Sequence, residues 1–172
     1  KGDDIRRMVQ ATLDRWGRVD VLVGNAGISF DEPVTGLEPD KLRQEVQVNL
    51  IAPMECAQAV LPVMLRQQSG HIINVASIEA LIASPGSSVY CATKFGLLGY
   101  SDSIRRRLRG TGIRVSVMLH MPALKLTNQI EKFPSAAASA RSLSEGFSRW
   151  RSIRARIALS GCTPMMSSTG LP

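Results

Sequence analysis

Apolar residues follow a helical spacing in three segments of this 172-residue chain. In residues 3–17 they recur three or four positions apart, which predicts an amphipathic helix. Residues 38–70 and 87–110 predict two longer helices. The first of these contains Pro53 and Pro62, and proline removes a backbone hydrogen bond from a helix interior. We therefore expect that helix to bend.

Three short runs rich in Val and Ile alternate with these helices, at residues 19–25, 71–76 and 112–119. The first run, VDVLVGN, is typical of a strand that is buried on both faces of a parallel sheet. An order of helix then strand, repeated three times, predicts parallel strands joined by right-handed crossovers, with helices on both faces of the sheet. The pattern therefore predicts an α/β fold with a partial, doubly wound parallel sheet.

The formal net charge of +7 is unevenly distributed along the chain. Residues 1–122 hold 14 Lys and Arg against 12 Asp and Glu, whereas residues 123–172 hold 7 against 2. The basic excess thus belongs mainly to a tail rich in Ser, Ala and Arg, which lacks a clear apolar period. We expect that tail to be poorly ordered, and we expect no nucleic-acid partner.

The three cysteines point to the compartment. Cys56, Cys91 and Cys162 show no paired spacing, and they form no metal-ligand pattern with His71 or His120. Reduced thiols in the cytoplasm are therefore expected, and no metal site is expected. No apolar run approaches the eighteen or so residues of a membrane span, so we expect no span.

Small and polar residues follow the predicted strands where open α/β sheets bind ligands, beyond the carboxyl ends of the strands. Asn25, Ala26 and Gly27 follow the first strand, and Ser77 follows the second. Asn49 lies in the middle of a predicted helix, where asparagine is mildly unfavourable and needs a reason. Each signal is weak alone, but together they indicate one site.

A tyrosine and a lysine stand near the start of the third predicted helix. Tyr90 comes thirteen residues after Ser77, and Lys94 follows four residues later. Four residues advance a helix by about 6 Å and place the two side chains about 40° apart around the helix axis. The two side chains are therefore able to meet. For an isolated pair at this spacing, a half-buried aromatic beside a solvated lysine is the commoner arrangement.

These motifs, in this order, resemble the short-chain dehydrogenase/reductase family. The resemblance runs from about Asp3 to Leu119, through GRVDVLVGNAGIS, VQVNLIAPMEC and SSVYCATKFGLLGY. It implies a Rossmann-like sheet and an oxidoreductase that moves a hydride between a nicotinamide and a carbinol carbon. The implied partner is a small-molecule alcohol or carbonyl substrate.

The resemblance also implies a role for each catalytic residue. Tyr90 is the general acid/base, and the ammonium of Lys94 lowers its pKa from the free value of about 10. Ser77 hydrogen-bonds the substrate oxygen and stabilises the charge that develops there. Asn49 holds a water in the path that the proton takes from Lys94.

The implied cofactor is NAD or NADP. By resemblance, Lys94 also binds the nicotinamide ribose hydroxyls, beside Tyr90. Asn25, Ala26 and Gly27 line the adenosine side of the cofactor. The sequence does not contain the glycine-rich turn that binds the cofactor pyrophosphate in this family. It also does not contain the residue that selects between NAD and NADP.

The chain departs from the family pattern in two further places. Gly24 replaces the first asparagine of the usual Asn-Asn-Ala-Gly, and LHMPALKL replaces the Pro-Gly continuation after the last strand. We therefore expect residues 1–122 to be an incomplete Rossmann-like catalytic domain, truncated at its front, and residues 123–172 to be an atypical tail. The chain alone is then expected to be inactive or nearly so.

The sequence pattern leaves two other functions to consider. A non-catalytic remnant or interaction module would keep the fold without holding a dinucleotide. A serine hydrolase using Ser77 fails at the motif level, because Ser77 sits in VASIE rather than in a Gly-x-Ser-x-Gly elbow. By resemblance, a complete version is expected to form a homo-oligomer through the long helices at 39–66 and 88–109. The apolar face of the second helix fits either that interface or packing within the chain.

Overall fold

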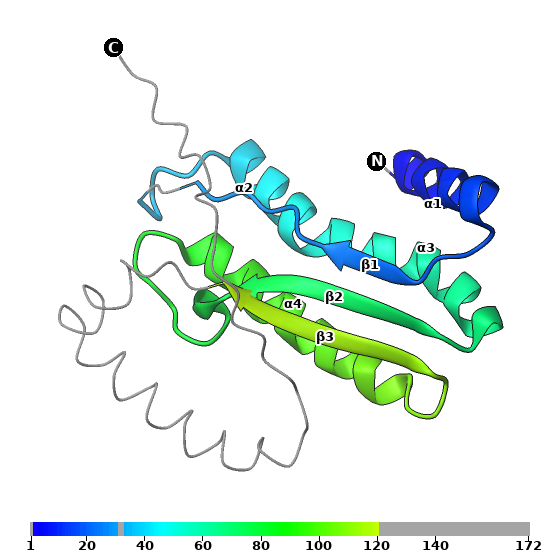
Figure 1. The fold of residues 1–172 in the computed structure, drawn as a ribbon. Coiled ribbons are helices and arrows are strands. Elements are labelled where there is room, and N and C mark those ends of the chain that lie inside the picture. Colours follow the sequence, from blue (N-terminus) through cyan, green and yellow to red (C-terminus); the bar gives the residue numbers. More distant parts are fainter. Residues whose placement is uncertain (1, 31–32, 121–172) are drawn as a thin grey trace.

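A three-stranded parallel sheet forms the centre of the computed structural model, which describes residues 2–30 and 33–120. The strands are β1 (Val21–Gly24), β2 (Gly70–Ser77) and β3 (Ile113–His120), in the order β1-β2-β3 (Figure 1). In the register, Val21 pairs with His71, and Gly70 pairs with Ile113. All three predicted strands are confirmed, and so is the predicted α/β class.

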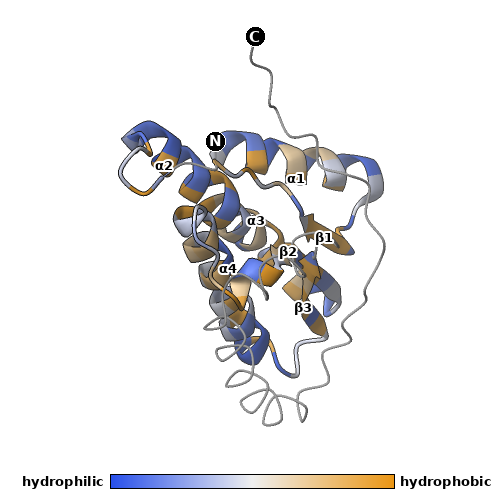
Figure 2. Ribbon diagram, turned by 90° about the vertical axis from the view of Figure 1, so that its left-hand side faces the viewer, coloured by the Kyte–Doolittle hydropathy of each residue, from blue (hydrophilic) through white to orange (hydrophobic). Residues whose placement is uncertain are grey.

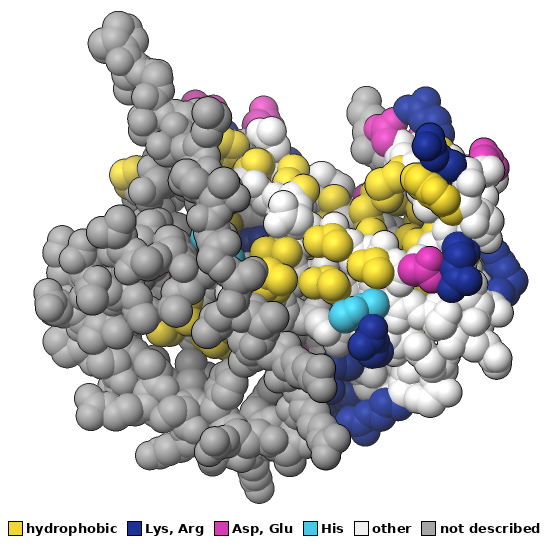
Figure 3. Space-filling model, viewed as in Figure 1, with side chains coloured by type: hydrophobic (Ala, Val, Ile, Leu, Met, Phe, Trp, Pro, Cys, Tyr) yellow, Lys and Arg dark blue, Asp and Glu magenta, His cyan; other side chains and the backbone are white. Residues whose placement is uncertain are grey.

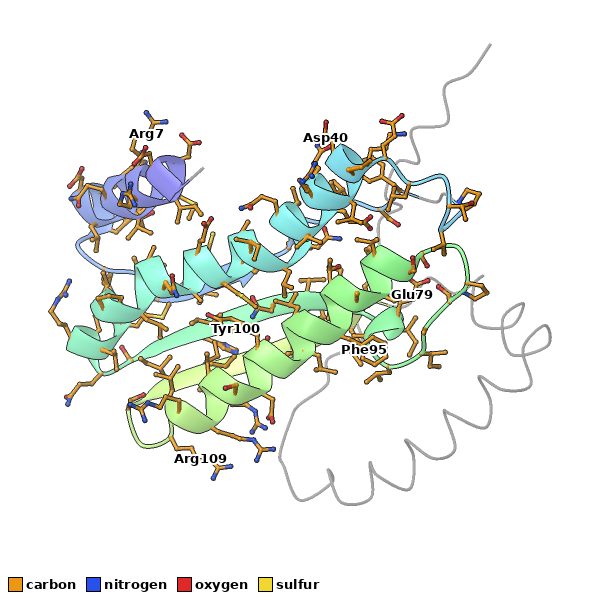
Figure 4. The ribbon with its side chains drawn as sticks, turned by 180° about the vertical axis from the view of Figure 1, so that it is seen from behind. Arg7, Asp40, Glu79, Phe95, Tyr100 and Arg109 are labelled. Carbon is orange, nitrogen blue, oxygen red and sulfur yellow. The ribbon has the colours of Figure 1, made fainter. Side chains whose placement is uncertain are left out.

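The helices connect the strands on one side of the sheet, so among the described residues the predicted helices on the other face are not seen. Helix α3 (Ala52–Gln67) and helix α4 (Ser88–Arg107) lie in front of the sheet when the molecule is seen from behind (Figure 4). Helix α1 (Gly2–Trp16) packs against α3 at the end of the layer next to β1. Gly17, with a φ of 69°, takes the left-handed conformation that ends α1, as its position predicts.

The long second helix contains an irregular turn where the sequence predicted a bend. Helix α2 (Pro39–Val46) passes into a π-helical turn, η1 (Gln47–Ile51), and then into α3. Pro53 lies in the first turn of α3, just after this π turn. Pro53 has no N–H and cannot donate the backbone hydrogen bond of a regular helix. The widened π turn lies at the place where that bond is missing. Pro62 lies inside α3 without ending it.

The core lies between the sheet and α3, with contributions from α1 and the end of α4. Met64 and Ile72 are fully buried there and Val60 nearly so, and Val9 of α1 joins the same cluster. Figure 2 shows the apolar strands and the blue, hydrophilic outer faces of the helices. Side chains of this size each contribute about 1.5–3 kcal/mol when they are fully buried, so the cluster stabilises the layer pairing.

Strand β1 is half-exposed, so the prediction that it is buried on both faces was wrong. Val21 and Val23 are 53% and 55% exposed. Within the described residues β1 is an edge strand with one neighbour, and no described helix covers these two valines. Figure 3 shows hydrophobic side chains gathered over this face of the sheet. A continuous apolar run reports the hydrophobicity of a strand but not which neighbours cover it.

The helix from Pro39 to Gln67 is long and apolar enough to cross a membrane, judged by length and composition alone. One such helix is weak support for a span, because a core helix of a globular protein passes the same test. Here Ala57, Val60 and Met64 on this helix lie in the core. The predicted boundary at residues 122/123 and the predicted poor order of the tail at 123–172 lie outside the described residues.

The turn between α4 and β3 requires a residue without a β-carbon at Gly112. Its φ is 79°, and a Cβ there would collide with the backbone oxygen of Gln68. We expect Gly112→Ala to lower the free energy of unfolding by about 2 kcal/mol or more, because left-handed backbone alone costs a β-carbon about 1–2 kcal/mol. Gly99→Ala, on α4 with open space around the new methyl, should raise it by about 0.5–1 kcal/mol. Urea unfolding of both variants measures the difference. Equal stability of Gly112→Ala and the unmodified chain would contradict this turn.

Candidate active site

The predicted catalytic residues meet at the carboxyl end of β2. Ser77 is the last residue of that strand and is buried, and Tyr90 lies in the first turn of α4. Lys94 follows one turn later and is only 3% exposed. Residues 78–87, which include a short 3₁₀ turn at Ile78–Ala80, connect β2 to α4 and pack against that helix, so the first turn of α4 lies at the carboxyl end of the strand.

Tyr90 and Lys94 are neighbours, as their spacing predicted. The Lys94 ammonium lies 5.3 Å from the centroid of the Tyr90 ring. It also donates a hydrogen bond of 3.1 Å to the carbonyl oxygen of Val75 on β2. The lysine thus faces the ring of the phenol, and the backbone of the strand anchors its head group.

Burial, rather than the lysine, sets the acidity of Tyr90 in this structure. Burial raises the pKa of the phenol, and the hydrogen bond with Ser77 opposes that rise. The charges of Glu79, Cys91 and Glu45 raise the pKa of Tyr90 further. The expectation that Lys94 holds this pKa low is therefore wrong here.

Lys94 is itself affected by its surroundings. Burial lowers the pKa of the Lys94 ammonium, because a charged group loses its hydration in the interior. Its position over the face of the Tyr90 ring gives a cation–π contact. That contact stabilises the lysine charge but does little to favour the phenolate.

Asn49 ties the loop after β1 to the helix layer. The backbone N–H of Ile28 donates to Asn49 Oδ1 at 2.8 Å, and Asn49 Nδ2 donates to the carbonyl oxygen of Ile28 at 2.7 Å. The amide also approaches Thr93 Oγ1 on α4 at 3.3 Å. Asn49 is fully buried in the π turn, so these bonds are the reason for a polar residue in mid-helix.

Gly27 lies where this loop, Asn49 and Lys94 converge. A β-carbon on Gly27 would lie 3.4 Å from Lys94 Nζ and 3.5 Å from Asn49 Oδ1. Asn25 and Ala26 lie in the same loop and are exposed. The seven predicted site residues are therefore brought to one edge of the sheet, and their roles in binding and catalysis stay predictions.

Sequence reasoning missed one buried acidic residue beside this site. Glu45 lies one helical turn before Asn49 and is fully buried, and neither of its carboxylate oxygens has a hydrogen-bond partner among the described residues. Burial raises its pKa more than the nearby backbone of Phe30 lowers it. The four-residue spacing to Asn49 was the available signal, because it places both side chains on one helix face.

The chain belongs to the short-chain dehydrogenase family. The family model described as short chain dehydrogenase matches residues 1–134. The chain is 38% identical, over 118 residues, to the 3-oxoacyl-(acyl-carrier-protein) reductase FabG of Staphylococcus epidermidis, covering 69% of this chain and 48% of that protein. It is 33% identical, over 135 residues, to the FabG of Thermotoga maritima, covering 78% and 54%.

Two solved structures resemble the fold. A metagenomic short-chain oxidoreductase in complex with NADP matches with a TM-score of 0.66 at 33% identity, covering 69% of this chain and 54% of that one. A short-chain dehydrogenase/reductase from Burkholderia phymatum in complex with NAD matches with a TM-score of 0.69 at 23% identity, covering 70% and 44%. The chain therefore spans about half the length of the relatives that it matches.

The two hydrogen bonds between Asn49 and Ile28 form a clamp on the loop after β1, and their removal should have a local and a global effect. Asn49→Leu removes the partners of both the N–H and the carbonyl oxygen of the half-buried Ile28 backbone, so we expect a loss of about 2 kcal/mol of stability. Amide exchange at Ile28 should rise further than exchange at Ile72 in β2. Equal acceleration at both amides would contradict a clamp that acts on the loop.

The acidity of Tyr90 is directly measurable, because the chain contains only two tyrosines. In a Tyr100→Phe variant, we expect Tyr90 to ionise above the ordinary value of about 10, because burial opposes the phenolate. Ser77→Ala should raise the midpoint further, since the Ser77 hydrogen bond lowers this pKa. Ultraviolet absorbance of tyrosinate against pH measures both, with the urea-unfolded chain as reference. A midpoint below that of the unfolded chain would contradict this account.

Proposed function

We propose that this chain carries the proton-transfer site of an NAD(P)-dependent oxidoreductase that interconverts an alcohol and a carbonyl. The convergence of Tyr90, Ser77 and Lys94 at one sheet edge carries this proposal. In carbonyl reduction the Tyr90 hydroxyl gives its proton to the substrate oxygen, and in alcohol oxidation the phenolate takes it back. A phenol keeps its proton at neutral pH, because its ordinary pKa is about 10, so Tyr90 is in the protonated form that the donor role requires.

Ser77 is suited to orient the substrate oxygen. Its Oγ accepts a hydrogen bond from the backbone N–H of Glu79 at 3.2 Å. A hydroxyl has one proton to donate, and this contact leaves that proton available for Tyr90 or for a substrate oxygen. Ser77 would thus stabilise negative charge at the oxygen that Tyr90 protonates.

The residues present fit the ribose end of a nicotinamide cofactor, which supplies the hydride when it is bound. The Lys94 ammonium has three N–H groups, and within the described residues one of them bonds to Val75. The others are available for two ribose hydroxyls. Gly27 leaves space beside the ammonium that a side chain would fill. The solved neighbours bound to NADP and to NAD support this assignment.

Asn49 supports the same chemistry indirectly. Its amide holds the loop that contains Gly27, and it lies close to the Lys94 head group. We assign to Asn49 the water that passes a proton from Lys94 to the solvent. Beyond the site, we place the whole protein in the cytoplasm and expect it to associate with copies of itself.

The first experiment removes the transferable proton. Because the chain spans about half the length of its relatives, we would fuse it behind the preceding segment of the Staphylococcus epidermidis reductase and follow NADPH oxidation with carbonyl substrates. Tyr90→Phe should lower turnover by about 100-fold or more, the usual contribution of general acid–base catalysis. Tyr100→Phe, a matched change on the same helix, should leave turnover unchanged. Full activity in Tyr90→Phe would overturn the proposal.

The second experiment tests Lys94. Lys94→Met removes the ammonium but keeps a long apolar side chain, so calorimetric titration of the fusion with NADPH should show weaker binding. Unchanged cofactor affinity in Lys94→Met would remove the lysine from the cofactor site.

A further inference from the structure

The segment between β2 and α4 and the first turn of α4 share a connected set of buried and half-buried polar side chains that the proposed chemistry does not use. We call these four residues, Glu79, Ser84, Ser87 and Cys91, the Glu79 network. Glu79 and Ser84 are 6% and 7% exposed, and Cys91 is 4% exposed. Figure 4 shows Glu79 beside the N-terminal end of α4.

The hydroxyls of the network converge on one carboxylate oxygen. Ser84 Oγ donates to Glu79 Oε1 at 2.5 Å, and the hydroxyls of Ser84 and Ser87 lie 2.7 Å apart. Ser87 Oγ also lies 3.5 Å from the same oxygen of Glu79. Ser87 precedes α4, yet its side chain does not cap the helix, because it is directed into this network.

The thiol of Cys91 closes the network from the helix side. Cys91 Sγ accepts from the backbone N–H of Ser84 at 3.4 Å and lies 3.9 Å from the hydroxyls of Ser84 and Ser87. The network therefore ties the loop to the first turn of α4. Tyr90 is the neighbour of Cys91 in that turn.

Glu79 also reaches the site from the other direction. Its backbone N–H donates to Ser77 Oγ at 3.2 Å, so Glu79 contacts the end of β2 through its backbone and the loop residue Ser84 through its carboxylate. Ser84 in turn contacts Cys91 in the first turn of α4. Ser77 and Tyr90 are thereby connected through a short polar path. The position of each depends on the conformation of the loop between them.

Glu79 is an unfavourable choice for packing alone. Burial of a carboxylate costs free energy that an apolar side chain would not incur. The charge of Glu79 also raises the pKa of Tyr90, which makes the phenolate harder to form. A residue with these two costs beside the site is better explained by what its oxygens hold in place.

We propose that Glu79 is a positioning residue that sets the relative placement of Ser77 and Tyr90 by fastening the loop 81–87 to α4. The contacts of the network are present in the structure whatever reaction the chain carries out. Their role in placing a catalytic pair rests on the proposed function. Glu79 itself does not touch the reacting atoms.

Chemical labelling of Cys91 in the 172-residue chain tests the fastening. Iodoacetamide labelling, resolved by peptide mass spectrometry, should be about tenfold faster at Cys91 in Glu79→Ala and in Ser84→Ala, because loss of the hydrogen bond opens the loop locally. Glu79→Gln keeps an acceptor oxygen and should stay near the unmodified rate. Ser103→Ala, an exposed serine on α4, is the matched control. Cys56 on α3 reports any general loosening.

Coupling between Ser77 and Tyr90 tests the positioning. In a Tyr100→Phe background, Ser77→Ala should raise the pKa of Tyr90, and this rise should shrink or vanish when Ser84→Ala is also present. In Glu79→Gln the coupling should remain while the pKa of Tyr90 falls, because a charge is removed. The proposal is overturned if the coupling is unchanged in Ser84→Ala, or if Cys91 and Cys56 accelerate together. Neither readout depends on dehydrogenase activity, so failure of the proposed function is distinguishable.

Discussion

The two hydrogen bonds between Asn49 and Ile28 are the constraint on which the site depends. They join the loop after β1 to the long second helix, and they satisfy both backbone groups of one residue in a buried place. The π turn that carries Asn49 widens the helix at this point and precedes Pro53. A local departure from α-helical geometry is therefore combined with a tertiary contact, as is common where helices serve functional sites. Gly27 takes its place beside Lys94 through the same loop.

The electrostatics of the site reflect a balance between burial and pairing. Lys94 is a buried cation, and burial lowers its pKa, while a strand carbonyl and the Tyr90 ring stabilise its charge. Tyr90 is a buried phenol whose pKa is raised for the same reason. Both groups are thus shifted toward their neutral forms. Such shifts are common at functional sites, because water is excluded there and each remaining partner acts more strongly.

The burial of strand β1 was not predicted correctly by the sequence pattern. The run VDVLVGN has the hydrophobicity of a strand covered on both sides, yet Val21 and Val23 are exposed in the described structure. Asn74 in the neighbouring strand is fully buried, and its Oδ1 has no partner in the described part of the chain. That oxygen points toward Gly24, where a β-carbon would lie 2.7 Å away. The glycine that departs from the family motif therefore leaves room for the asparagine of the next strand.

The sequence by itself determined the elements, their parallel order and the identity of the residues around Tyr90, because period and spacing are local properties that the chain carries in any environment. The four-residue step from Tyr90 to Lys94 follows from helix geometry, and the order of the motifs follows from the chain. Only the tertiary structure decided that Lys94 lies over the ring and that Glu45 is buried with no hydrogen-bond partner for its carboxylate among the described residues. The same holds for the contacts of Glu79 with Ser77 and Ser84. These features depend on which side chains from distant segments pack together and exclude water. The spacing of apolar residues within one segment carries no information about such contacts.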